Sequence, residues 1–217
     1  MTDFRLRCFA QSGNAYKAAL MLELCGLDWE PVFVDYFNGE TRREDWRAEV
    51  NPMGEVPVLH HGDLTIAQSG VILDYLAGLT GRFGAENEAE RREILGWILF
   101  DNHKFTSYYA TLRFLVGLAG QPEGPVTEFL RTRVTGAYGV VEKRLARHPF
   151  LVGDRPTIAD LSLAGYVYMP EPPGVDPAAW PAIAAWKERI AALPGWRHPY
   201  DLLPGAPESW RGAAAAG

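Results

Sequence analysis

The sequence predicts an α/β domain followed by an all-helical domain. In residues 1–78, short strand-like runs of apolar residues alternate with helical patterns, and residues 79–87 read as a linker. From residue 88 to residue 203 the apolar residues recur every three to four positions, which is the period of a helix. Residues 204–217, which end in Gly and Ala, are predicted to form a flexible tail.

The first domain opens with a strand, a helix and a second strand. Residues 4–9 alternate apolar and basic side chains, as a half-buried strand does. Residues 15–25 repeat apolar side chains at helical spacing, and Gly26 follows at the place where a helix end favours a left-handed residue. Residues 29–34 form the next strand, with its proline near the start, where proline does least harm.

A short helix, a hairpin and a longer helix complete this domain. The polar segment 41–49 is predicted to be helical, and strands at 56–59 and 64–66 flank a tight loop. Ser69 then opens a helix over residues 71–79. The order β-α-β-(α)-β-β-α is typical of a thioredoxin-like domain.

Four helices are predicted in the second domain, over residues 88–116, 126–145, 157–167 and 181–193. A proline-rich loop at 169–174 separates the last two, and Pro181 stands in the first turn of the last helix, where its missing N–H is tolerated. Thr157 and Asp160 have the spacing of a helix capping box, so we expect them to have a structural role.

The composition is that of an ordinary globular protein, with 47% hydrophobic residues, 22% charged residues and a net charge of −6. The basic residues are scattered, which argues against a nucleic-acid-binding protein. The N-terminus lacks the apolar core of a signal peptide, and no apolar run suffices for a membrane span. Cys8 and Cys25 are predicted to be buried structural thiols of a cytoplasmic protein. The histidines lack ligand spacing, so no metal site is predicted.

Four segments carry a family resemblance when they are read together. They are Ser12-Gly13-Asn14-Ala15-Tyr16-Lys17, Asn51-Pro52-Met53-Gly54-Glu55-Val56-Pro57-Val58-Leu59, Gln68-Ser69 with the helix after it, and Thr157-Ile158-Ala159-Asp160-Leu161. In this order and spacing, the chain resembles the cytosolic glutathione S-transferase superfamily, in its bacterial Ser-Gly-Asn-x-Tyr-Lys type, from residue 4 to about residue 203. The resemblance implies the same two-domain fold, with glutathione as a co-substrate and no metal.

Ser12 and Asn14 are the predicted catalytic residues. Both lie between a strand and the amino end of a helix, where unpaired N–H groups and the helix dipole favour an anion. A thiol with a pKa of about 8.5 is mostly protonated at neutral pH. A hydroxyl or amide donor would lower that pKa and produce the nucleophilic thiolate. The alternative is that either residue simply caps the helix, and the sequence favours neither as the main partner of the thiolate.

Val56, Pro57, Gln68 and Ser69 are predicted to bind glutathione. The resemblance implies a cis Val56–Pro57 bond, with the Val56 backbone pairing with the cysteinyl part of glutathione like an added strand. A trans proline in an edge strand is the alternative. Gln68, which replaces an acid common in bacterial relatives, and Ser69 would hold the γ-glutamyl end, because a helix start suits a carboxylate. Ser69 also fits a plain helix cap, and both roles can hold at once.

Glu55 is the fifth residue predicted to bind glutathione, and it departs from the family pattern. Relatives often have Lys or Gln at this position, near the glycine carboxylate of glutathione, so here two carboxylates would face each other. At about 4 Å near a protein surface this repulsion amounts to about 4 kcal/mol. We expect weaker glutathione binding unless Arg42 or Arg43 supplies a cation.

The pocket for the second substrate is predicted to include Tyr16, His103, Tyr108 and Arg113. Aromatic residues at helical spacing more often belong to a core or a dimer contact, and Arg113 suits an ion pair as well as it suits an anionic substrate. These residues mark where a pocket would lie without identifying its ligand.

The leading functional prediction is a glutathione transferase, an enzyme of detoxification in which the glutathione thiolate attacks a small electrophile. A glutathione-dependent disulfide reductase or peroxidase is the enzymatic alternative, and a non-catalytic binding module is the alternative of another class. The Ser-Ser-Cys signature of the maleylacetoacetate isomerase branch is absent. The resemblance also implies a homodimer, and the scattered charges and the lack of a long apolar run predict that it binds neither nucleic acid nor membrane.

Overall fold

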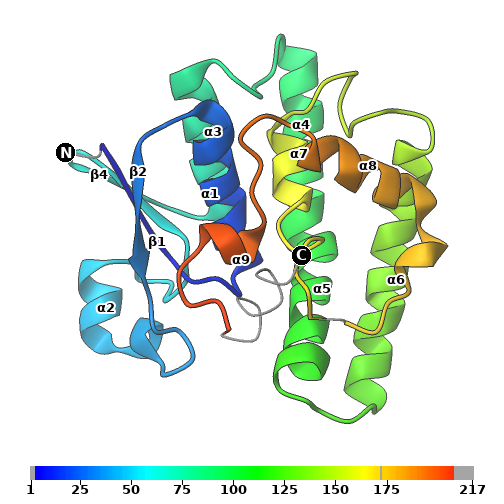
Figure 1. Ribbon diagram of the computed structural model, residues 1–217, viewed down its shortest axis with the longest axis horizontal. Coiled ribbons are helices and arrows are strands. Elements are labelled where there is room, and N and C mark those ends of the chain that lie inside the picture. The colour runs from blue at the N-terminus through cyan, green and yellow to red at the C-terminus, as the bar shows by residue number, and fades with distance from the viewer. Residues whose placement is uncertain (1–2, 172, 208–217) are drawn as a thin grey trace. The chain divides into compact units, whose positions relative to one another are not determined.

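The computed structural model describes residues 3–171 and 173–207, which form two compact units (Figure 1). The first unit runs to Thr80 and takes in the chain again from Pro194, while the second is Gly81–Leu193. The first unit contains the only sheet found in the described ranges, and the second is helical. The prediction of an α/β domain followed by an all-helical domain is confirmed.

The segment that begins at Pro194 belongs to the first unit, although the sequence placed it with the helices before it. It contains the short helix α9 (Pro199–Leu202), which packs near α1. The Tyr16 hydroxyl donates to the carbonyl of Arg197 at 2.8 Å, and the Ala10 N–H donates to the carbonyl of Pro204 at the same distance. Most of the predicted flexible tail, from residue 208 on, lies outside the described residues.

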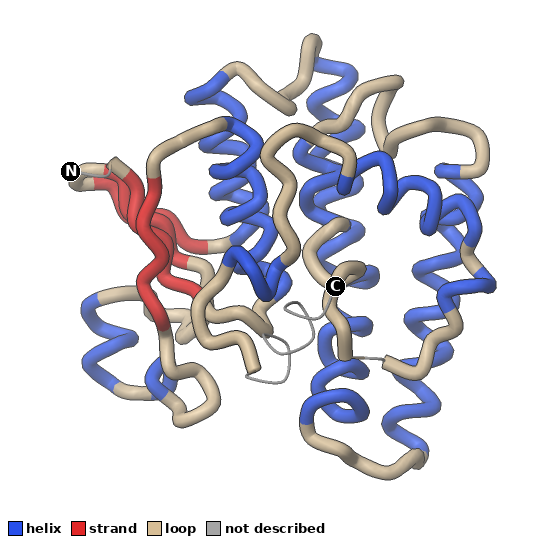
Figure 2. The backbone as a smooth tube through the Cα atoms, in the orientation of Figure 1, coloured by secondary structure: helices blue, strands red, loops and turns tan. Residues whose placement is uncertain are grey.

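The sheet of the first unit has four strands in the order β2-β1-β3-β4, drawn in red in Figure 2. Their bounds are Phe4–Cys8 for β1, Trp29–Phe33 for β2, Val58–His61 for β3 and Leu64–Ala67 for β4. β1 pairs in parallel with β2 and antiparallel with β3, and β3 pairs antiparallel with β4. This mixed sheet is the thioredoxin-like arrangement that the element order predicts.

Helices lie on both faces of this sheet. The helices α1 (Gly13–Cys25) and α3 (Ser69–Thr80) pack against each other on one side of it, as Figure 1 shows. Side chains alternate across a strand, so Leu6 points to that side and is fully buried, whereas Arg7 points the other way. There the Arg7 Cζ lies 5.4 Å from the centroid of the Trp46 ring. Trp46 belongs to α2 (Glu44–Glu49), and the 3₁₀ turn η1 (Glu40–Arg42) precedes this helix.

The second unit consists of helices joined by loops. They are α4 (Glu88–Phe100), the π-helical turn η2 (Asp101–Phe105), α5 (Thr106–Arg113), the π-helical turn η3 (Phe114–Leu118), α6 (Pro125–Leu145), α7 (Ile158–Leu163), the 3₁₀ turn η4 (Pro177–Ala179) and α8 (Pro181–Ala191). The predicted helix 88–116 is therefore continuous in the backbone but contains two π-helical turns. At the first of them, buried Asp101 accepts hydrogen bonds at 2.6 Å from Thr106, five residues on, and from Ser162.

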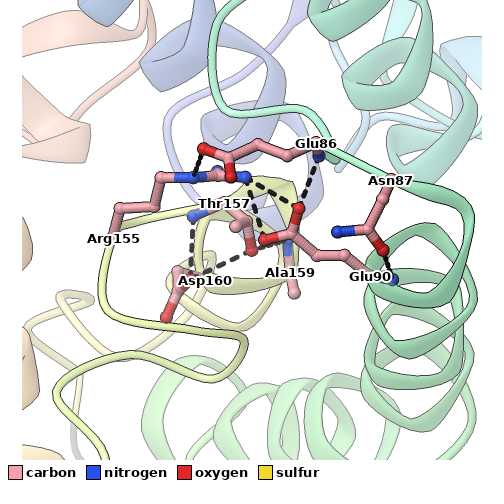
Figure 3. A network of polar contacts seen from close by, with 7 residues as sticks. All are labelled: Glu86, Asn87, Glu90, Arg155, Thr157, Ala159 and Asp160. Atoms are coloured by element: carbon pink, nitrogen blue, oxygen red, sulfur yellow. Dashed lines mark hydrogen bonds and ion pairs between the residues drawn. The ribbon is translucent and has the colours of Figure 1, made fainter.

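The predicted capping box at the start of α7 is confirmed (Figure 3). The Thr157 hydroxyl accepts from the N–H of Ala159 at 3.3 Å, and the Thr157 N–H donates to the Asp160 carboxylate at 2.9 Å. Beside it, Arg155 forms ion pairs at 2.9 Å with both Glu86 and Glu90. The helix ends at Leu163, earlier than predicted, shortly before the helix-weakening Gly165.

Candidate functional site

Three loops leave the same end of the sheet and form the candidate site. The register pairs Arg7 of β1 with Val58 of β3, and Val58 with Ala67 of β4. The end of β1, the start of β3 and the end of β4 therefore lie next to one another. The loop that leads to Ser12, the Val56–Pro57 step and the start of α3 all extend from this end.

Ser12 is the N-cap of α1. It is 5% exposed, and its hydroxyl oxygen accepts from the N–H of Ala15 at 3.1 Å. The capping role that the sequence left open is thus present. A hydroxyl also has one hydrogen to donate, and no described residue accepts it.

Asn14 lies in the first turn of α1 and is half-buried. Its side-chain oxygen is buried and has no hydrogen-bond partner among the described residues. Leaving such an atom without a partner costs about 1–3 kcal/mol. A buried amide oxygen without a partner is an exception in folded proteins, and it marks the start of α1 as an unusual environment.

The loop before β3 is held by Asn51, a buried residue of the Asn51–Leu59 segment to which the sequence alone assigns no role. Its side-chain N–H donates to the carbonyl of Glu55 at 2.9 Å, and its side-chain oxygen accepts from the N–H of Met53 at 3.1 Å. Gly54 has a φ of +68°, and the Arg47 guanidinium lies against it. The loop that presents Glu55 is thus fixed by contacts on both sides.

The Val56–Pro57 bond is cis, as predicted. Val56 is half-buried, and its N–H and C=O take no part in the backbone hydrogen bonds of the described residues. Pro57 is buried next to the start of β3. Val56 therefore offers one donor and one acceptor to an extended peptide, which is the requirement for strand addition.

The Glu55 side chain is directed toward the start of α3. Its carboxylate accepts a hydrogen bond of 2.9 Å from the side-chain amide of Gln68, which also lies 3.2 Å from the sulfur of Met53. Gln68 has a φ of 71° and is one of two non-glycine residues with positive φ in the described chain. Such conformations cost about 1–3 kcal/mol and cluster at ligand sites.

Ser69 is the first residue of α3 and is 4% exposed. No described residue forms a hydrogen bond with its hydroxyl, and the first backbone bond of the helix runs from Ile72 N–H to the carbonyl of Gln68. The N–H groups of the first turn therefore lack intrahelical partners. The Ser69 hydroxyl and these N–H donors together suit an anion.

Tyr16 lies inside the first unit. It is fully buried in α1, and its hydroxyl is used in the bond to Arg197. Cys8 is also buried, and burial raises the pKa of its thiol to about 12. Neither Cys8 nor Cys25 stands at the start of α1, so the described residues place no protein thiolate there.

In the second unit, the three predicted pocket residues differ in how far they are exposed. His103 is exposed in the η2 turn, and Tyr108 is half-buried on α5. Arg113 is 2% exposed and forms an ion pair of 2.5 Å with Glu171. Neighbouring Tyr109 is part of the core, and burial raises the pKa of its hydroxyl to about 12.

The chain matches two family models in succession. The model "Glutathione S-transferase, N-terminal domain" covers residues 5–78, and "Glutathione S-transferase, C-terminal domain" covers residues 104–194. Glutathione S-transferase 3 of Zea mays is 30% identical over an alignment that covers 94% of this chain and 96% of the relative. This chain belongs to the cytosolic glutathione transferase superfamily.

Other relatives in the superfamily are named for different activities. A maleylacetoacetate isomerase of Rhizobium meliloti (strain 1021) is 32% identical, with 89% of this chain and 95% of the relative covered. A disulfide-bond oxidoreductase of Escherichia coli (strain K12) is 28% identical, with 86% and 89% covered. Membership in the superfamily therefore leaves the reaction open.

Solved structures of glutathione transferases match the whole fold. The enzyme of Pseudomonas fluorescens Pf-5 has a TM-score of 0.86 at 33% identity, covering 91% of this chain and 99% of its own. That of Xanthobacter autotrophicus Py2 has a TM-score of 0.83 at 35% identity, covering 93% and 97%. A homologue from Lodderomyces elongisporus, solved with two glutathione molecules per subunit, has a TM-score of 0.84 at 28% identity, covering 94% and 100%.

The described residues contain neither a candidate membrane span nor a candidate metal centre. None of the described helices has the length and apolarity to cross a membrane. Within the same part of the chain, His, Cys, Asp and Glu side chains form no group of three that could hold a metal ion.

Proposed function

We propose that this protein is a glutathione transferase that binds glutathione along Val56 and Ser69. The observation that carries the proposal is the meeting of two peptide-binding features at one end of the sheet. Val56 has an N–H and a C=O outside the backbone hydrogen bonds of the described residues, next to a cis proline. Ser69, at a helix start, is a buried residue whose hydroxyl has no partner among the described residues. An extended peptide with a terminal carboxylate satisfies both.

Ser12 and Asn14 are proposed to stabilise the thiolate of the bound glutathione. The Ser12 hydroxyl caps α1 through its oxygen, so its hydrogen is available to a sulfur anion. The amide of Asn14 adds donors in the same helical turn, and its buried oxygen can accept from the peptide. The positive end of the α1 dipole acts in the same direction.

The proposed reaction joins the glutathione sulfur to a small electrophile. The thiol loses its proton to solvent, the thiolate attacks an electrophilic carbon, and a carbon–sulfur bond forms as the leaving group departs with its electron pair. With a chromogenic aryl halide the leaving group is the halide. The residues of the chain bind, orient and ionise the thiol, and none of them forms a covalent bond.

The test combines binding with turnover. Calorimetry with glutathione is expected to show saturable binding, and the aryl halide assay should show conjugation above the uncatalysed rate. Ser12→Ala and Asn14→Ala are expected to lower kcat by about a hundredfold, the lower end of the effect of one lost donor to a developing charge. A wild-type protein that binds no glutathione would contradict the proposal and would favour the non-catalytic module.

A glutathione-dependent disulfide reductase is the second candidate, and the similarity to a bacterial disulfide-bond oxidoreductase favours it. No cysteine stands at the start of α1 in the described chain, so both electrons would come from glutathione. Two glutathione molecules and one disulfide would yield oxidised glutathione and two thiols. Reduction of a model disulfide faster than conjugation of the aryl halide would favour this candidate.

His103 and Tyr108 are the proposed contacts for the second substrate, because they are the predicted pocket side chains that retain exposure. For Tyr16 and Arg113 we propose structural roles, since each is buried and bonded within its own unit. Substitution of His103 or Tyr108 is expected to raise KM for the electrophile and leave glutathione affinity unchanged. The opposite pattern would contradict this division of roles.

We also propose that the enzyme is a homodimer. Its sequence subtype is proposed to be the bacterial Ser-Gly-Asn-x-Tyr-Lys type, and its role is proposed to be detoxification. Exposed apolar side chains on α3 (Val71 and Leu79) and on α4 (Leu95 and Leu99) support a contact with a second copy. Both cysteines are free thiols, which supports a reducing compartment such as the cytoplasm.

A further inference from the structure

We propose that Glu55 binds the α-ammonium group of the γ-glutamyl residue, so that the site recognises a free amino-acid head group. This assignment rests on the proposed function, because it concerns how the same site holds glutathione. It also reverses the sequence-based expectation that Glu55 opposes the glycine carboxylate and weakens binding.

The direction of the Glu55 side chain is the first argument. Its carboxylate accepts from the Gln68 amide at 2.9 Å, which brings a negative charge to the residue immediately before α3. No cation of the described chain forms an ion pair with Glu55. A carboxylate has about four lone-pair positions, so the bond from Gln68 leaves most of its accepting capacity for a ligand.

The start of α3 supplies the complementary feature. Only 4% of the Ser69 surface is exposed, and its hydroxyl has no partner among the described residues. The hydroxyl and the unpaired N–H groups of the first turn favour a carboxylate. Ser69 thus offers donors for an anion. Gln68, the residue before it, is bonded to the Glu55 carboxylate, which can accept from a cation.

A free α-amino acid carries both charges on one carbon. Its carboxylate suits the start of α3, and its ammonium suits the Glu55 carboxylate through a charge-assisted hydrogen bond. Gln68, whose φ is 71°, donates the side-chain hydrogen bond that the Glu55 carboxylate accepts. Gln68 is neutral and would bind the ammonium less strongly than a carboxylate would. Glu55 therefore supplies the negative charge that pairs with the ammonium.

The experiment compares glutathione with glutaryl-cysteinylglycine, which lacks only the α-amino group. Calorimetry is to be run on the wild type, on Glu55→Gln, on the double variant Glu55→Gln/Gln68→Glu, and on Glu49→Gln as a control for an exposed glutamate nearby. The wild type and the control should prefer glutathione by about tenfold to a hundredfold, the range for one hydrogen bond to a charged group.

The single variant Glu55→Gln should lose that preference while its affinity for the deaminated peptide stays the same. The double variant should regain the preference, because it returns a carboxylate to the same place. A preference that survives in Glu55→Gln overturns the assignment, and so does tighter glutathione binding by this variant. If the wild type binds neither peptide, the proposed function fails together with the assignment. Glu55 is exposed, and an unchanged unfolding midpoint verifies the fold of each variant.

Discussion

Gly54 sets the conformation of the loop that presents Glu55 and Val56. Its φ is +68°, and an added Cβ would lie 2.8 Å from the carbonyl oxygen of Thr41 and 3.0 Å from the Arg47 guanidinium. Gly54→Ala therefore combines a left-handed penalty of about 1–2 kcal/mol with a backbone clash. We expect a lower denaturation midpoint and weaker glutathione binding.

The matched control for this prediction is Gly62→Ala. Gly62 has a φ of +56°, but nothing lies within 4 Å of an added Cβ. Its variant should lose only the conformational part of the stability and should retain glutathione affinity. Equal losses in the two variants would show that the contact with Thr41 is unimportant.

At the residue scale, the sequence could locate the candidate site but not its internal bonds. The Val56–Pro57 step and the position of Ser69 before a helix are local patterns, and local patterns are readable in a sequence. The bond between Glu55 and Gln68 joins residues 13 positions apart, and its direction depends on how Asn51 fixes the loop. The orientation of Glu55 was therefore available only from the structure.

Thr157 anchors the amino end of α7. Its hydroxyl accepts from the N–H of Ala159, and Asp160 completes the capping box. Thr157→Ala is expected to reduce the free energy of unfolding by about 1 kcal/mol, as measured by chemical denaturation. Thr157→Ser keeps the oxygen and should cost much less. An alanine variant as stable as the wild type would contradict the cap.

Asp160 makes the same element sensitive to pH. Burial raises the pKa of this carboxyl to about 6, while hydrogen bonds from Leu151, Thr157 and Trp186 act in the opposite direction. The folded state thus binds more protons than the unfolded state, in which the pKa is 3.8. The contribution of Asp160 to stability is present below pH 3.8 and is lost as the pH rises through about 6.

The measurement is the free energy of unfolding of the wild type minus that of Asp160→Asn at each pH. This difference should fall between pH 4 and pH 7 and then stay level. A difference that is constant or rises over this range would contradict the raised pKa, because the loss of hydrogen bonds in the variant shifts the difference at every pH and only the titration of Asp160 makes it depend on pH.

At the scale of elements, the spacing of apolar residues along the sequence predicted the strands and the long helices, because this spacing is a local property of the chain. The π-helical turn η2 was not predictable, because it depends on the buried bonds of Asp101 to Thr106 and to distant Ser162. The four-residue helix α9 was missed for a similar reason. Its segment is held by contacts with α1, which no short window of sequence reveals.

At the scale of the whole molecule, exposed leucines one turn apart on α4 support the proposed homodimer. Leu95 is 46% exposed and Leu99 is 61% exposed. Leu99→Glu places a charge that could not be paired within an apolar contact, so light scattering should show a shift from dimer toward monomer. Val126→Glu, at a side chain that is 64% exposed on α6, is the control and should remain dimeric. A wild-type monomer would contradict the proposal.

The pKa of the thiol of bound glutathione tests most directly whether the start of α1 produces a thiolate. It can be followed by the ultraviolet absorbance of the thiolate in a pH titration of the saturated complex. We expect a value below the free value of about 8.5, shifted back toward it by Ser12→Ala and by Asn14→Ala, and retained by Ser12→Thr. A bound thiol that titrates like free glutathione in the wild type would contradict the account.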